Sequence, residues 1–322
     1  MQLLIIEFTL IVLISVGIGI LAAMTGISGG AFKVPILIIL FTLGAELAIA
    51  SSLFSALFVA IVSTIGYYRQ DSHLIEFRVG TIAIVATIPG SYVGVWIRTI
   101  VAHAHLLQIV FGIILFPVAL KLMLAKEDDK EHSDGEKRMR NFSQLGWQRS
   151  LTSILAIFLA GVSAGLLGLG GGTIIVPTLC IILEFPFIKA AATSMYVMIF
   201  TSSAGSLINY SILSQTPDFT AFLYFGLSMG VGMIIGGIIG PRFSSRVNSA
   251  ELQKLFGFLL IFPLVKMMRL GHLWLNPDGS NYILATIGDA IIWLIIGIPI
   301  WILTTHYIIP RWKKKDQNTN GL

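Results

Sequence analysis

Long apolar runs alternate with short polar gaps along almost the whole chain. A helix rises 1.5 Å per residue, so about 20 apolar residues are needed to cross a bilayer. Most of the runs have roughly that length, and the pattern therefore predicts a helical membrane protein with eleven segments. The apolar runs cover residues 3–24, 31–43, 47–68, 79–97 and 106–124, and, after a charged stretch from Lys126 to Arg149, residues 151–167, 173–185, 190–214, 220–240, 251–270 and 282–309.

Two of these runs, 31–43 and 173–185, are too short to cross a bilayer. Each follows a glycine cluster directly and contains a proline, Pro35 or Pro177, near its start. Glycine costs about 1 kcal/mol against alanine inside a helix, and proline is favoured in a helix's first turn. At both places the sequence predicts that one helix stops inside the membrane and a short new helix begins.

The chain repeats itself with a constant shift of 142 positions (168 minus 26). GISGGAFKVP, residues 26–35, aligns with GLGGGTIIVP, residues 168–177, and the same shift pairs residues 50–54 with 192–196. Because each half has an odd number of segments, the two halves must have opposite orientations. We therefore predict an all-α polytopic membrane protein of two inverted-topology repeats, each with about five segments including a short broken helix.

The predicted boundaries follow from this repeat. Residues 1–124 form the first transmembrane repeat, 125–150 a charged cytoplasmic linker and 151–270 the second repeat. Residues 271–322 supply one extra C-terminal transmembrane helix and a basic cytoplasmic tail. The shift also pairs Gly90 with Gly232 and Gly94 with Gly236, and these glycines fit close helix packing better than ligand binding.

Composition and charge agree with a membrane chain. Of the 322 residues, 56% are hydrophobic and 11% are charged. A net charge of +5 would suggest nucleic acid in a soluble protein, but here the basic residues lie in the gaps between apolar runs. We expect no nucleic-acid partner. Counting lysines and arginines predicts a cytoplasmic-membrane protein with its N-terminus outside and its C-terminus cytoplasmic, which leaves Arg98, Lys266 and Arg269 on the outer side.

A helix that begins inside the membrane leaves its first N–H groups unpaired, and these donors and the helix dipole attract an anion. Paired, glycine-interrupted short helices in inverted repeats are typical of secondary transporters that bind substrate near the midplane. Lys33 either steers the anion or extends to the cytoplasmic interface. The serines and the threonine at the start of the next long segments either support the loops or form hydrogen bonds with the backbone of their own helix. The candidate binding residues are Gly26, Ser28, Gly29, Gly30, Lys33, Ser51, Ser52, Gly168, Gly170, Gly171, Gly172, Thr173, Thr193 and Ser194.

The doubled Gly-Gly-x-x-x-Val-Pro motif, at residues 29–35 and 171–177, is followed in each half by an Ala-Ser-Ser or Ala-Thr-Ser run. These motifs resemble the sulfite exporter TauE/SafE family of bacterial and archaeal membrane proteins, over roughly residues 5–270. The resemblance implies transport of a small sulfur oxoanion, such as sulfite or the organosulfonate sulfoacetate. The first half departs from the second by having Ser28 in place of a glycine and Lys33 where the repeat has Ile175.

Two other functions share some of these features. An anion channel would use the same site chemistry. Gly26-Ile27-Ser28-Gly29 resembles the serine motif of rhomboid intramembrane proteases, but the matching position 170 is a glycine and His306, at the end of the last segment, is the only histidine in or near a span. We therefore expect a transporter and no catalytic residue.

The sequence also suggests no cofactor and no metal. It has one cysteine, Cys180, which excludes a four-thiolate site. A nucleotide-binding G-x-x-x-x-G-K-[ST] motif is absent, so we expect transport to be secondary. The expected partners are a small anionic substrate and the lipid bilayer, and no pattern indicates an oligomeric state.

Overall fold

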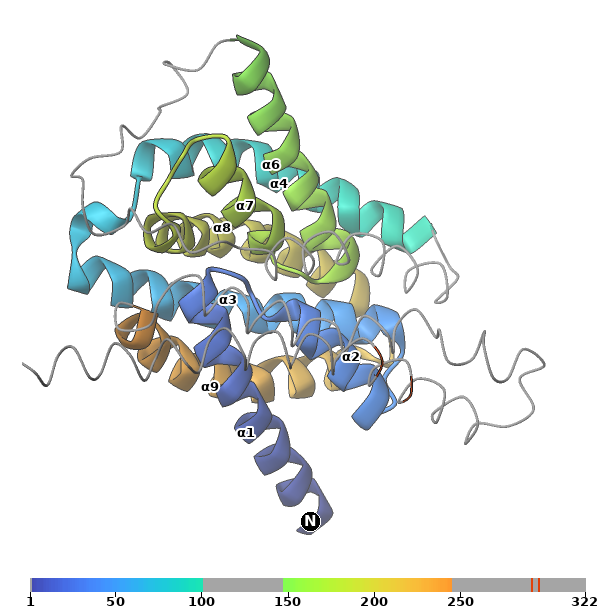
Figure 1. Cartoon of the computed structure of the whole chain (residues 1–322). Coiled ribbons are helices and arrows are strands. Elements are labelled where there is room, and N and C mark those ends of the chain that lie inside the picture. The colour runs from blue at the N-terminus through green and yellow to red at the C-terminus, as the bar shows by residue number, and fades with distance from the viewer. Residues whose placement is uncertain (1, 101–146, 245–290, 292–294, 296–322) are drawn as a thin grey trace, which may run out of the picture. The chain divides into compact units, whose positions relative to one another are not determined.

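A computed structural model describes residues 2–100 and 147–244, together with positions 291 and 295. The predicted segments 106–124 and 251–270, residues 125–146 of the predicted linker, and the last segment apart from those two positions lie outside the described residues. The predicted boundary at residue 151 is four residues late, because the helix that opens the second half already begins at Trp147. The helices, shown in Figure 1, are α1 (Gln2–Thr25), α2 (Gly30–Leu40), α3 (Ala45–Gln70), the 3-10 turn η1 (Ser72–Leu74), α4 (Phe77–Ile100), α6 (Trp147–Leu167), α7 (Gly172–Ile181), α8 (Phe187–Leu213) and α9 (Phe219–Ser244).

Six of the described helices are long and apolar enough to cross a membrane, whereas α2 and α7 have only 11 and 10 residues. Large apolar side chains are exposed on the outer faces, among them Leu13 of α1, Val85 of α4 and Leu155 of α6. Serine and threonine side chains are instead buried between helices. This distribution suits a chain whose solvent is lipid, and the protein is an all-α, multi-pass membrane protein.

The helix starts follow the predicted repeat. The first residues of α2, α3 and α4 are 30, 45 and 77, and those of α7, α8 and α9 are 172, 187 and 219, a difference of 142 in each case (172 minus 30). The prediction placed the prolines in the first turn of the short helices. That detail is wrong, because α2 already begins at Gly30 and Pro35 is its sixth residue.

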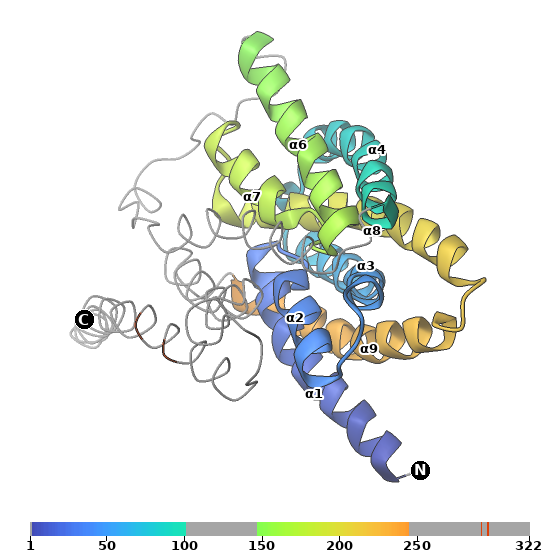
Figure 2. The same cartoon turned by 90° about the vertical axis from the view of Figure 1, so that its right-hand side faces the viewer.

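The fourth described helix of each half, α4 or α9, packs against helices of the other half. In both views, α9 lies beside α1 and α3, whereas α4 lies beside α6 and α8 (Figures 1 and 2). Glycines allow these helices to approach closely: a Cβ atom at Gly236 would lie 2.6 Å from Cα of Gly19, and one at Gly94 would lie 2.8 Å from the backbone nitrogen of Leu166. The prediction that Gly94 and Gly236 serve helix packing is confirmed.

Candidate functional site

Two glycine-rich loops join the broken helices, one between α1 and α2 and the other between α6 and α7. Gly29 and Gly171, the residues that precede α2 and α7, have φ values of 70° and 85°. Gly26, Gly168 and Gly170 also have positive φ, at 74°, 70° and 64°. A side chain is strained in this left-handed region, so glycine is needed for the chain to turn from each helix into the next.

The two loops contact each other directly through their backbones. A Cβ atom at Gly30 would overlap the carbonyl oxygen of Gly168, and one at Gly172 would overlap the carbonyl oxygen of Gly26. These two pairs match under the repeat, since 168 and 172 correspond to 26 and 30. The absence of side chains at Gly30 and Gly172 therefore serves the contact between loops.

Ser28 links the first loop to the second. Its Oγ donates a 2.5 Å hydrogen bond to the carbonyl oxygen of Leu169 and accepts a 3.2 Å hydrogen bond from the backbone N–H of Gly30. The side chain is fully buried, and His73, the histidine that the described ranges contain, is exposed in η1. Within the described ranges Ser28 therefore has no buried histidine to act as its base, and its hydroxyl holds the loops together; His306 lies outside these ranges.

Serines of the next long helices support the loops from the other half. Ser52 Oγ donates a 3.1 Å hydrogen bond to the carbonyl oxygen of Gly168, and Ser194 Oγ donates a 2.9 Å hydrogen bond to that of Gly26. Ser52 and Ser194 match under the repeat, as do the two carbonyls. Each half thus uses a buried hydroxyl of its next long helix to hold the loop of the other half, and the first half adds Ser28.

The neighbouring candidates Ser51 and Thr193 do not reach the loops. Ser51 Oγ lies 3.5 Å from the carbonyl oxygen of Phe222 in α9, and Thr193 Oγ1 accepts a 3.1 Å hydrogen bond from the backbone N–H of Glu76. Of the four candidate hydroxyl residues in α3 and α8, the structure therefore brings only Ser52 and Ser194 to the loops.

Lys33 is fully buried rather than extended to the membrane interface. Its Nζ donates hydrogen bonds to the carbonyl oxygen of Ser52, at 2.7 Å, and to Oγ of Ser55, at 2.9 Å. Lys33 is the fourth residue of α2, and through Ser52 it connects to the second loop. The sequence analysis missed Ser55, although its spacing of three residues from Ser52 places both on one helix face.

The start of α7 carries an unused polar group. The backbone N–H groups of Ile174 and Ile175 both donate to the carbonyl oxygen of Gly171 at 3.1 Å, so Gly172 and Thr173 supply the first helix donors without an intrahelical partner. Thr173 Oγ1 is buried and has no hydrogen-bond partner among the described residues. A buried hydroxyl is normally satisfied, and this one lies where the helix dipole favours negative charge.

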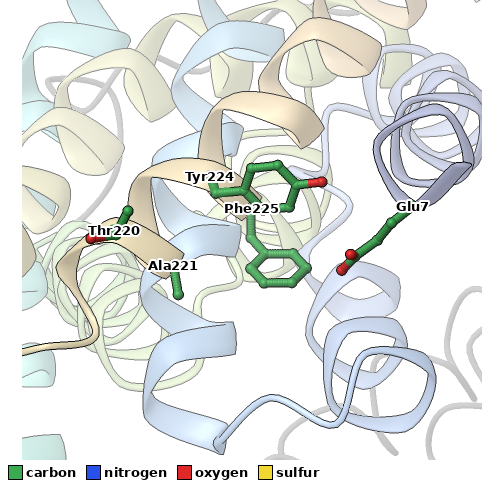
Figure 3. Close-up of a pocket in the computed structure, with 5 residues that line it drawn as sticks. All are labelled: Glu7, Thr220, Ala221, Tyr224 and Phe225. Carbon is green, nitrogen blue, oxygen red and sulfur yellow. The ribbon is translucent and has the colours of Figure 1, made fainter. Parts of the chain in front are cut away.

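An open hollow of about 380 Å³ lies apart from the loops, between the N-terminal parts of α1 and α9. Figure 3 shows that Glu7 of α1 faces Tyr224 and Phe225 of α9 across this hollow, with Thr220 and Ala221 on the α9 side. It contains no residue of either loop. The carboxyl group of Glu7 would repel an anion, so this hollow is not the predicted binding site.

A family model described as "Sulfite exporter TauE/SafE" matches residues 11–267. "Probable membrane transporter protein YunE" of Bacillus subtilis is 25% identical over 79% of this chain and 95% of its own length. A relative from Methanocaldococcus jannaschii, also named a probable membrane transporter protein, is 26% identical over 78% of this chain and 91% of its own length. "Sulfite exporter TauE/SafE family protein 5" of Arabidopsis thaliana is 31% identical over 51% of this chain and 35% of its own length. No solved structure gives a significant match.

Proposed function

The chain belongs to the sulfite exporter TauE/SafE family, and on this basis we propose that it is a secondary transporter for a small sulfur-containing oxoanion, such as sulfite or an organosulfonate like sulfoacetate. Its relatives are named as membrane transporters, which is not an enzymatic function. The proposal adds to that general function a class of substrate and a place where the substrate binds.

The observation that carries the proposal is the unpartnered hydroxyl of Thr173. It lies beside the free donors at the start of α7, and its matching residue in the first half is Ala31. An oxoanion accepts several hydrogen bonds and would satisfy the hydroxyl and the backbone N–H groups together. The proposed site thus centres on Gly171, Gly172 and Thr173.

The first half contributes positive charge to the proposed site. The start of α2 adds a second helix N-terminus, where the N–H groups of Phe32 and Lys33 both bond the carbonyl oxygen of Gly29 at 3.0 Å. The ammonium group of Lys33 lies within the same half-helix and bonds Ser52, which itself bonds the second loop. Among the described residues, the hydrogen-bond partners of Lys33 include no carboxylate, and an anionic ligand would stabilise the charged form of this buried side chain.

The contact between the loops favours a carrier over a channel with the same site chemistry. Gly30 and Gly172 each lie against a carbonyl group of the opposite loop, so the two loops are in direct backbone contact. In a carrier, the halves would move apart to admit an anion to the start of α7, as alternating access requires. We place the protein in the cytoplasmic membrane with its N-terminus outside and its C-terminus in the cytoplasm, following the lysine and arginine count.

Transport by purified protein in liposomes tests the proposal, with sulfite, sulfate, sulfoacetate and taurine offered in turn. Thr173→Val keeps the shape of the side chain and removes the hydroxyl. A hydrogen bond to a charged group contributes about 1.5–3 kcal/mol, so this variant should weaken anion binding by about 10- to 100-fold. Binding is read as the rise in unfolding temperature on adding the anion.

Thr178→Val is the matched control, because Thr178 lies in the same helix and its Oγ1 donates to the carbonyl oxygen of Ile174 at 2.7 Å. It should bind the anion like the parent protein. If Thr173→Val and Thr178→Val both bind and transport the anion like the parent, the binding site is not at the start of α7. If no sulfur oxoanion is bound or moved by the parent, the proposed substrate class is wrong.

A further inference from the structure

A buried arginine of α4 bonds the last turn of α6, just before the second glycine-rich loop. Arg98, in the last turn of α4, is 3% exposed. Its Nη1 donates a 3.2 Å hydrogen bond to the carbonyl oxygen of Gly165, and its Nη2 donates to Oδ1 of Asn209 in α8. The sequence analysis counted Arg98 among the basic residues of a polar gap, but α4 continues to Ile100 and the side chain turns inward.

Stabilising the end of α6 does not by itself require an arginine. Gly165 matches Ala23 of α1 under the repeat, and Asn209 matches Tyr67. In the first half, Tyr67 Oη donates a 2.7 Å hydrogen bond to the carbonyl oxygen of Ala23. The first half therefore satisfies the corresponding carbonyl with a neutral side chain, whereas the second half uses a buried positive charge.

In the described part of the chain, Arg98 makes no hydrogen bond to a carboxylate. Its hydrogen-bond acceptors are a backbone carbonyl and a neutral amide. Glu46 interacts with it electrostatically, but this residue is exposed in the first turn of α3. Burying a charge costs several kcal/mol unless a partner compensates it, so an anion would stabilise the guanidinium group here.

Four hydrogen-bonding groups, one on Arg98 itself and three on α8, are also unused. Arg98 Nε, Asn209 Nδ2, Ser206 Oγ and Ser202 Oγ are buried and have no partner among the described residues. Because arginine only donates, the amide oxygen of Asn209 must face it, which leaves the amide NH₂ group as a donor. Residues 202, 206 and 209 of α8 share one helix face, so their polar groups are aligned along it.

We propose that Arg98, Asn209 and Ser206 form a second anion-binding station for the transported oxoanion, separate from the start of α7. This inference rests on the proposed function. The station lies in the last turns of α4 and α8, at the end of α8 that leads into α9 and that the topology places outside. It holds the anion between the outer surface and the glycine-rich loops. Its polar groups are covered in this structure, so the anion reaches them when α4 and α8 separate.

Asn209→Asp tests this inference, because it distinguishes an anion site from a structural contact. The new carboxylate keeps an acceptor for Arg98 Nη2, so a purely structural contact would be preserved or strengthened. An anion site would instead lose a donor and have its positive charge neutralised. We expect Asn209→Asp to unfold within a few degrees of the parent without anion, and to raise the apparent KM for external sulfite, sulfate or sulfoacetate at least tenfold.

Ser206→Ala is the second variant, should Asn209→Asp fail to fold. It removes one unused donor and should raise the apparent KM about fivefold, whereas Ser203→Ala, whose Oγ only bonds the carbonyl oxygen of Ile199 in the same helix, should leave it unchanged. Parent-like KM values in both Asn209→Asp and Ser206→Ala would overturn the inference.

The same measurements separate the inference from the proposed function. If Thr173→Val loses anion binding while Asn209→Asp and Ser206→Ala keep it, the site at α7 stands and the second station does not exist. If the parent protein binds none of the three anions, the proposed function fails, and the station for the transported oxoanion fails with it.

Discussion

Ser28 and Gly170 face each other where the two loops meet: a Cβ atom at Gly170 would lie 2.5 Å from the Cβ atom of Ser28 and 2.7 Å from its Oγ. The two residues occupy matching positions of the repeat. Close-packed atoms cannot share this space, so only one of the two positions can carry a side chain. This explains why a serine in the first loop corresponds to a glycine in the second.

Gly170→Ser should destabilise the protein by about 2–4 kcal/mol, because it adds an overlap with Ser28 and a side chain at a left-handed backbone angle. Gly17→Ser in α1 is the control, since a Cβ atom there meets nothing within 4 Å. Thermal unfolding in detergent measures both. The double variant Ser28→Gly with Gly170→Ser should recover part of the loss, because the overlap is removed and the backbone strain remains. No difference between Gly170→Ser and Gly17→Ser would contradict this account.

Ser52→Ala and Ser194→Ala should each lower the free energy of unfolding by about 1–3 kcal/mol, since each leaves a buried loop carbonyl with less hydrogen bonding. Their effects should be similar, because the two contacts match under the repeat. Ser63→Ala is the control: its Oγ lies 3.5 Å from the carbonyl oxygen of Gly237, at the limit of a hydrogen bond, and its loss should matter less. If Ser52→Ala or Ser194→Ala leaves the free energy of unfolding unchanged, the hydroxyl of that serine does not support the loop.

Lys33→Met should keep the fold, because an apolar side chain of similar length often replaces a buried charge at little cost. It should weaken binding of divalent sulfate more than that of monovalent methanesulfonate if the ammonium lies within a screening length of the anion, about 8 Å in physiological salt. Anion-dependent shifts in unfolding temperature report the two affinities. Ser55→Ala removes one partner of Lys33 without removing the charge and should show no such preference. Equal weakening for both anions would exclude a direct electrostatic role for Lys33.

Ser72 and Ser214 provide a direct test of inverted topology. They match under the repeat and both are exposed, Ser72 in η1 and Ser214 just after α8. Single cysteines at these positions, in a Cys180→Ala background, should react with a membrane-impermeant reagent from opposite sides, with Ser214→Cys labelled from outside. Labelling of both from the same side would rule out the inverted arrangement.

The described helices could largely be predicted from the sequence, because lipid imposes a simple pattern of apolar runs. The break before Gly30 and the break before Gly172 followed from glycine clusters and from the shortness of the next run, and α2 and α7 begin within one residue of the predicted positions 31 and 173. The repeat made this prediction stronger, since the same break occurred twice.

The contacts between halves could not be predicted in this way. Gly30 and Gly172 were predicted as binding residues, and the contact of each with the backbone of the opposite loop was not foreseen. The sequence analysis also treated Ser51 and Ser52 alike, although only Ser52 reaches a loop. Such details depend on how helices of different halves pack, which no local pattern contains. The buried position of Arg98 was missed for the same reason, because a basic residue near the end of an apolar run is usually solvated.

The exchange of helices between the halves has a consequence for biosynthesis. The loop that contains Gly26 obtains its supporting hydroxyl from Ser194, and α1 obtains its neighbour α9, only after most of the chain has been made. Until then, the loop's polar backbone groups face a bilayer that offers no hydrogen-bonding solvent. When the first four helices have been synthesised, the first half therefore still lacks the hydroxyl that bonds the carbonyl oxygen of Gly26. Folding must end with a late step in which both loops dock together.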